Sequence, residues 1–126
     1  KKMAAPNIVN VATITAKTST ALLTGTSAVA AVNNPASSGK VMKINSLLVS
    51  NVDGVNSATI TVSIYPNDDL AGTAVLIAKT LVVPADSLLV VIDKNMGLYL
   101  EEDKSLGVTA SAANDLTYTV TFEELS

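Results

Sequence analysis

Short runs in which apolar and polar residues alternate dominate this sequence, and they restrict the chain to a β-sheet fold. The clearest run is 58–65, where isoleucine and valine share one face and threonine, serine and tyrosine share the other. A period of two is the signature of a strand with one buried face. The best helical window, 21–32, contains Gly25 between two threonines, which makes it a poor helix.

The whole chain shows this pattern, and it predicts eight or nine short strands. They are expected at 8–15, 28–32, 41–50, 58–65, 75–83, 88–93, 98–100, 106–112 and 116–123, with a short piece at 20–23. Turn residues such as Asn-Pro, Asp-Gly and Pro-Asn-Asp separate the runs. Short strands with such punctuation predict an all-β protein, a single β-sandwich of mainly antiparallel strands. Jelly-roll and immunoglobulin-like wirings both fit this number of strands.

Two features of the central strands carry predictions of their own. Asp53 and Gly54 lie in the loop 51–56, and Asp-Gly between apolar runs is a hairpin signal. We therefore expect a hairpin loop between the strands 41–50 and 58–65. Near the end of 41–50, leucine and valine occupy both phases of the alternation, which predicts burial on both faces.

The few aromatic residues can be assigned to faces from the same alternation. Tyr118 and Phe122 share a face with Val120, so we expect them to fill the core, with the tyrosine hydroxyl at its wet rim. Tyr99 lies between two leucines and should face away from them, at a surface or an interface.

The composition excludes most chemistry. The 126 residues include no cysteine, histidine, arginine or tryptophan, and all eight basic residues are lysines. The chain therefore lacks the side chains used most often for general-base catalysis, thiolate chemistry and bidentate phosphate binding. A formal charge of -3 gives no electrostatic footprint for nucleic acid. We predict no enzymatic activity, no catalytic or cofactor-binding residues, no cofactor and no nucleic-acid partner.

Acidic residues form three clusters, which raises the question of calcium. The clusters are Asp68-Asp69, 101–103 and Glu123-Glu124. Calcium needs six to eight oxygen ligands, so two clusters would have to meet at one end of the sandwich. Adjacent acids at strand ends are usually solvated, and we predict no metal site.

No segment predicts a membrane span or a second domain. The longest uncharged stretch, 18–39, contains an asparagine pair and a proline, which disfavours a spanning helix. We expect one domain over 1–126, with 1–7 a flexible arm or a remnant of cloning. The segment 1–15 is a candidate arm that packs on a neighbour, so deletion up to Asn10 is expected to weaken assembly more than folding.

Three stretches together resemble a known class of proteins. They are 38–54, which contains SGK and SNVDG; 97–111, which begins GLYLEED; and 118–126, which ends VTFEELS. In order and spacing they are similar to small virion structural proteins of tailed bacteriophages, particularly phages of cyanobacteria. The resemblance runs from about Pro6 onward, and it rests on strand spacing and turn residues.

The resemblance implies a capsid decoration or cement protein in the virion. Such a protein is displayed in many copies, as trimers or other small homo-oligomers, and binds the major capsid protein or other virion proteins. Two alternatives stay open: a tail, neck or fibre subunit that binds a receptor or carbohydrate, and a filament subunit joined by strand exchange. Only 15% of residues are charged, which fits a subunit whose remaining apolar surface is covered by neighbours.

Overall fold

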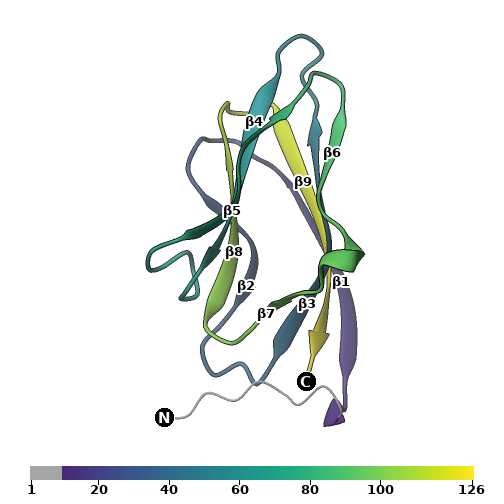
Figure 1. Cartoon of the computed structure of the whole chain (residues 1–126), viewed down its shortest axis with the longest axis vertical. Helices are drawn as coiled ribbons and strands as arrows, with labels where there is room; N and C mark the ends of the chain where they lie inside the picture. Colours follow the sequence, from purple (N-terminus) through teal and green to yellow (C-terminus); the bar gives the residue numbers. More distant parts are fainter. Residues whose placement is uncertain (1–9) are drawn as a thin grey trace.

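The computed structural model describes residues 10–126, and these residues form nine β-strands in two packed antiparallel sheets (Figure 1). The five-stranded sheet has the order β1 (Ile14–Leu22), β9 (Leu116–Leu125), β3 (Val41–Asn51) and β6 (Leu88–Ile92), and β7 (Leu98–Leu100) also pairs with β3. The four-stranded sheet has the order β2 (Val29–Asn34), β8 (Lys104–Ala110), β4 (Ala58–Tyr65) and β5 (Val75–Val83). The predicted all-β sandwich is confirmed.

The strand pairing has jelly-roll topology. Strand β1 pairs with β9, β2 with β8, β3 with β6 and β7, and β4 with β5. The first half of the chain therefore pairs with the second half in reverse order, as one long hairpin wrapped into two sheets. The short 3-10 helix η2 (Lys94–Met96) separates β6 from β7, which occupy successive parts of the same edge of β3.

The loop after β3 is not a hairpin loop, and the prediction for 51–56 is wrong. Strands β3 and β4 lie in different sheets, so the loop carries the chain across the sandwich. The Asp53 carboxylate accepts hydrogen bonds from the N–H groups of Val55 and Asn56, at 2.7 and 3.0 Å. Such an Asx-type turn occurs in loops that connect two sheets as well as in hairpin loops. The sheet in which the next strand packs determines which of the two loops is formed.

A β-bulge, rather than burial on both faces, explains the pattern of β3. The register with β9 shifts just after Ile44, so the inward-facing residues change from even to odd numbers. Met42 and Ile44 face the core before the bulge, and Leu47 and Val49 face it afterwards. Leu48 lies on the outer face and is only partly buried. One face of β3 is thus the core face throughout, and the predicted double burial is wrong.

The first strand lies later in the chain than predicted. Strand β1 spans Ile14–Leu22, instead of the predicted 8–15, and includes most of the short piece at 20–23. Its residues are almost all exposed, so no apolar face marks it in the sequence. The N–H groups of Ala12 and Thr13 donate to the Ser126 carbonyl, so the chain is part of the sheet from Ala12 onward. Residues 1–9 of the predicted arm, which include 1–7, lie outside the described residues.

The core between the sheets contains the aromatic residues that the alternation predicted. Tyr118, Val120 and Phe122 are all buried, whereas Tyr99 on β7 has 43% of its surface exposed. Among residues 10–126, no helix has the length and apolar character needed to span a lipid bilayer.

Two buried asparagines connect the sheets at opposite ends of the sandwich. Asn34 ends β2 in the four-stranded sheet, and its amide donates to the carbonyls of Lys40 and Leu100, the latter in the five-stranded sheet. Asn51 ends β3 in the five-stranded sheet, and its amide donates to the carbonyls of Asn56 and Val83, the latter in the four-stranded sheet. Each of these amides satisfies carbonyls that the closing ends of the sandwich would otherwise bury without a partner.

Candidate interaction surface

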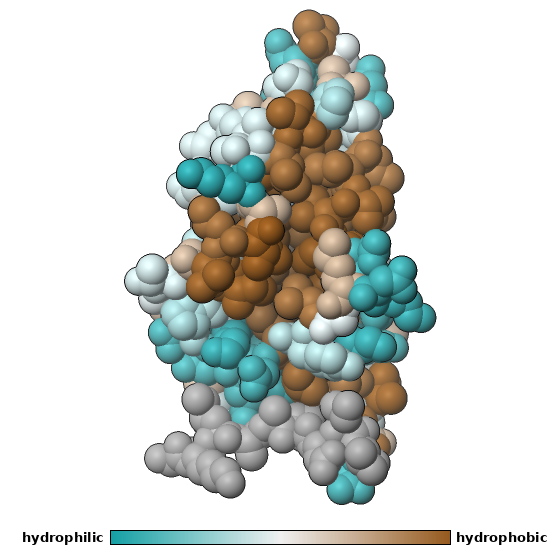
Figure 2. Space-filling model, viewed as in Figure 1, coloured by the Kyte–Doolittle hydropathy of each residue, from teal (hydrophilic) through white to brown (hydrophobic). Residues whose placement is uncertain are grey.

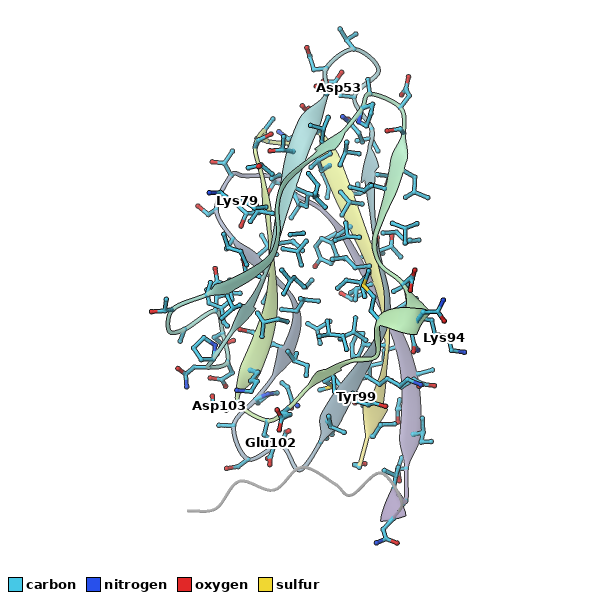
Figure 3. All side chains as sticks on the ribbon, viewed as in Figure 1. Asp53, Lys79, Lys94, Tyr99, Glu102 and Asp103 are labelled. Carbon is cyan, nitrogen blue, oxygen red and sulfur yellow. The ribbon has the colours of Figure 1, made fainter. Side chains whose placement is uncertain are left out.

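Exposed apolar residues gather along one long side of the sandwich, where the edge strands β5 and β6 lie. Figure 2 shows this side as a largely continuous apolar surface between polar borders. We call it the apolar band and define it by six residues that are each between 45% and 64% exposed: Val75, Leu76, Ile77, Val82, Leu88 and Val90. Figure 3 places Lys79 of β5 on one side of the band and Lys94 of η2 on the other.

The irregularity of β5 explains why its apolar residues are exposed. The register between β4 and β5 shifts twice, and Thr80 has a φ of 48°, which is unusual for a β-branched residue. Three successive apolar residues, 75–77, cannot all face the core of a regular strand. Strand β5 is also the edge of its sheet and has no second neighbour among residues 10–126.

The exposed part of β6 follows from its pairing with β3. Leu88 and Val90 lie opposite Ser50 and Leu48 on the outer face of the five-stranded sheet. The sequence predicts a strand at 88–93; in the structure Val91 and Ile92 are its buried residues, and Leu89 is partly buried against the core.

The band is large enough to be an interface. Its six side chains expose an apolar area on the order of 500 Å², which is near the upper end for the largest patch on a monomer. One partner in a protein–protein interface of standard size buries roughly 800 Å². The sequence predicts that neighbours cover apolar surface, but it does not locate that surface, because the pairing of distant strands decides that β5 and β6 are the edges of their sheets.

The structure brings two of the three acidic clusters together through hydrogen bonds. The Asp103 carboxylate accepts from the backbone N–H of Asp68 at 3.1 Å and from the side chain of Asn67 at 3.0 Å. Glu102 is buried and accepts from the N–H of Gly39 at 2.8 Å. Within the part of the chain that the structure describes, no group of three acidic, histidine or cysteine side chains could hold a metal ion. These carboxylates bind the loops to one another.

The third acidic cluster lies beside three lysines. Glu124 is 3.2 Å from both Lys17 of β1 and Lys40, which precedes β3. Partial burial raises the pKa of Glu124, but the hydrogen bonds and the positive charges of Lys17 and Lys40 together outweigh it, and the net shift of the pKa is downward. Glu123 faces Lys43 at 4.0 Å. This cluster therefore ties β9 to β1 and β3.

Acid is expected to destabilise the fold. Backbone hydrogen bonds lower the pKa values of Asp53 and Asp103, and the pKa of Glu124 is also lowered. A lowered pKa adds stability that is fully present above the unfolded values of 3.8 for Asp and 4.5 for Glu, and that disappears as the pH falls through the folded value. Asp115 acts in the opposite direction, because burial and the nearby Asp53 raise its pKa.

The measurement is thermal unfolding from neutral pH down to pH 3. At pH values below about 4.5 the melting temperature should decrease, because protonation removes the stabilising contribution of three carboxyl groups and adds one from Asp115. Asp103→Asn should lower the melting temperature at neutral pH and flatten the acid part of the curve. A melting temperature that rises on acidification would mean that Asp115 dominates and would contradict the prediction.

Comparison with known proteins identifies the fold and no family. No family model and no curated protein matches the chain. Among solved structures, a pilus protein of Bacillus endospore appendages is 15% identical with a TM-score of 0.51, over 90% of this chain and 88% of that one. The capsid of Ralstonia phage GP4 is 13% identical with a TM-score of 0.47, over 98% of this chain and 90% of that one. A protein of the infectious bursal disease virus particle is 12% identical with a TM-score of 0.41, over 91% of this chain and 31% of that one. The first of these supports the sandwich fold.

Proposed function

We propose that this chain is a non-enzymatic structural subunit of a phage particle, a decoration protein that binds the capsid in many copies and stabilises it. The apolar band on β5 and β6 carries the proposal, because exposed apolar patches of this size often mark contacts with other proteins. The sequence adds two supports. It has no histidine, cysteine or arginine, and its strand spacing and turns resemble those of phage virion structural proteins.

The size of the band fits a subunit that acts in many copies. Burying about 500 Å² of apolar surface at ~25 cal/mol per Å² contributes on the order of 10 kcal/mol. Association costs about 4–15 kcal/mol in lost freedom of motion, so one band alone gives weak binding. Repeated contacts over a shell, or contacts of one oligomer at several points, would convert weak contacts into firm attachment.

Leu88→Lys is the variant that tests the band. Leu88 is 57% exposed on the outer face of β6, so lysine should be tolerated by the fold and should place a charge inside the interface. We expect binding to purified particles to weaken at least tenfold, since burying an unpaired charge is costly. Val55→Lys is the matched control, because Val55 is 84% exposed in the loop before β4. Equal loss in both variants, or full occupancy by Leu88→Lys, would contradict the proposal.

A filament subunit is the second candidate, because the likeness to the pilus protein extends over most of both chains. That pilus family is described as disulfide-linked, whereas this chain has no cysteine. A filament of this chain would therefore need non-covalent contacts only. Electron microscopy of the purified protein separates the two candidates: fibres support the filament, and closed oligomers that bind capsids support decoration. Binding to a glycan array would instead favour a tail or fibre subunit.

A further inference from the structure

The outer edge of β1 is a second surface that is suited to protein contacts. Strand β1 is the end strand of the five-stranded sheet, and its nine residues pair with β9 without a register shift. Among residues 10–126, no strand pairs with its other side. The β6 edge, which carries part of the apolar band, lies at the opposite end of the same sheet.

The hydrogen bonds to β9 show which groups on β1 are left for a partner. Thr13 and Ser126 exchange N–H and carbonyl bonds, and the N–H of Leu23 donates to Leu116. In an antiparallel ladder such bonded positions recur at every second residue, so the odd-numbered residues of β1 bond to β9. The N–H and C=O groups of the even-numbered residues point outward. These residues are Ile14, Ala16, Thr18, Thr20 and Leu22.

This edge lacks the features with which proteins usually prevent edge pairing. Natural edges are protected by proline, bulges, short length or exposed lysines. Strand β1 has nine residues, no proline or glycine and no bulge. Its one charged side chain, Lys17, forms an ion pair with Glu124 inside its own sheet at 3.2 Å.

We propose that β1 pairs antiparallel with β1 of a second copy of this chain, around a two-fold axis at Thr18. The outward N–H and C=O groups are placed symmetrically about Thr18, so in this register each of them meets a hydrogen-bonding group of the partner subunit. Thr18 lies opposite Thr18 of the partner subunit, Ala16 opposite the partner's Thr20, and Ile14 opposite the partner's Leu22. Five N–H groups from each copy then donate to the other copy, and the two five-stranded sheets become one continuous sheet.

The side chains agree with this register. Ile14 and Leu22 are 62% and 42% exposed, and the two-fold axis brings these apolar ends together. Thr18 meets its own copy, and threonine pairs across strands are favourable. Lys17 lies opposite Ser19 of the partner subunit, so no two lysines are directly opposed. The edge carries no uncompensated charge that would select an acidic or basic peptide, which favours a second copy as the occupant.

This dimer goes beyond the proposed function and does not depend on it. Because β1 and β6 are at opposite ends of their sheet, pairing through β1 leaves the apolar band uncovered on both copies. A dimer of this kind would present two bands, whether the particle that it joins is a capsid or a filament.

Single cysteines introduced into the full chain test the register, since the chain has no cysteine of its own. In the proposed dimer, Thr18→Cys places two cysteines on a directly opposed, hydrogen-bonded pair, with Cα atoms about 5.5 Å apart, within the range of a disulfide. Thr20→Cys is the matched control. Its two cysteines would be separated by four positions along the strand, about 14 Å. Both variants are oxidised at micromolar concentration and separated on a non-reducing gel.

We expect Thr18→Cys to form covalent dimers at least tenfold faster than Thr20→Cys. A mixture of Ala16→Cys and Thr20→Cys chains should also form covalent dimers, because those positions face each other. Equal rates for Thr18→Cys and Thr20→Cys would overturn the register. A Thr18→Cys chain whose thiol reacts with a small reagent but does not form dimers would overturn the pairing itself. Neither result bears on particle binding, which the Leu88→Lys variant tests separately.

Discussion

Replacing Asn51 with alanine is expected to lower the free energy of unfolding by about 3 kcal/mol, since buried carbonyls left without a donor cost roughly 1–3 kcal/mol each. The amide of Asn51 donates to the carbonyls of Asn56 and Val83, both at 2.9 Å, and its oxygen accepts from the N–H of Asp53 at 2.9 Å. Alanine removes all three hydrogen bonds at a buried position, since Asn51 is only 3% exposed. The Val83 carbonyl is fully buried, so water cannot replace its hydrogen bond without opening the end of the sandwich.

Urea unfolding monitored by tyrosine fluorescence or circular dichroism measures the change. The control is Asn95→Ala, because Asn95 is exposed in η2 and exposed substitutions usually change stability by less than about 0.5 kcal/mol. A loss of that small size for Asn51→Ala would show that its hydrogen bonds contribute little to closing the sandwich.

Asn34 at the opposite end has the same arrangement and extends the test. Its amide donates to the carbonyls of Lys40 and Leu100, and its oxygen accepts from the Ser38 hydroxyl. The two asparagines share no partner, so the losses in Asn34→Ala and Asn51→Ala should add in the double variant within about 0.5 kcal/mol. Each asparagine therefore closes its own end of the jelly roll.

The runs 58–65, 75–83 and 98–100 match β4, β5 and β7 at both ends. In β4 the two faces meet different environments, and the alternation marks the strand. Strand β5 is exposed at most positions, and its limits follow instead from its apolar run and from the turn residues after Val83. Strand β1 was misplaced because both of its faces are exposed, so burial leaves no alternation in its sequence. In β3, a single bulge shifts the core-facing residues from even to odd positions. An uninterrupted alternation assumed over the whole strand then predicts apolar residues, and therefore burial, on both faces.

The order of the strands in the two sheets could not be predicted from the sequence. The turn at Asp53 has the residues of a hairpin, yet β3 and β4 lie in different sheets. The apolar band and the open edge of β1 both depend on which strands end a sheet. That order follows from the pairing of strands far apart in the chain, such as β1 with β9. Composition indicated that a surface of this kind exists, and topology determined its position.

Gly107→Ala is expected to cost about 2 kcal/mol, because added atoms in a well-packed site typically cost 1–3 kcal/mol. Gly107 lies in the middle of β8 between Ala30 of β2 and Ser63 of β4. A Cβ atom there would lie 2.7 Å from Cε1 of Tyr65 and 3.0 Å from Cδ2 of Leu70. The glycine is therefore required by the close approach of the tyrosine ring and the leucine to the outer face of the four-stranded sheet.

A double-variant cycle with Tyr65→Ala distinguishes this steric cause from a loss of strand propensity. If the ring is the obstacle, Gly107→Ala should cost at least about 1 kcal/mol less in the Tyr65→Ala background than in the natural chain, as expected for residues in direct contact. Gly25→Ala is the matched control, because a Cβ at Gly25 has no neighbour within 4 Å. Urea unfolding gives all four free energies. An equal cost of Gly107→Ala in both backgrounds would mean that Tyr65 can move aside freely, and that β8 needs glycine for another reason.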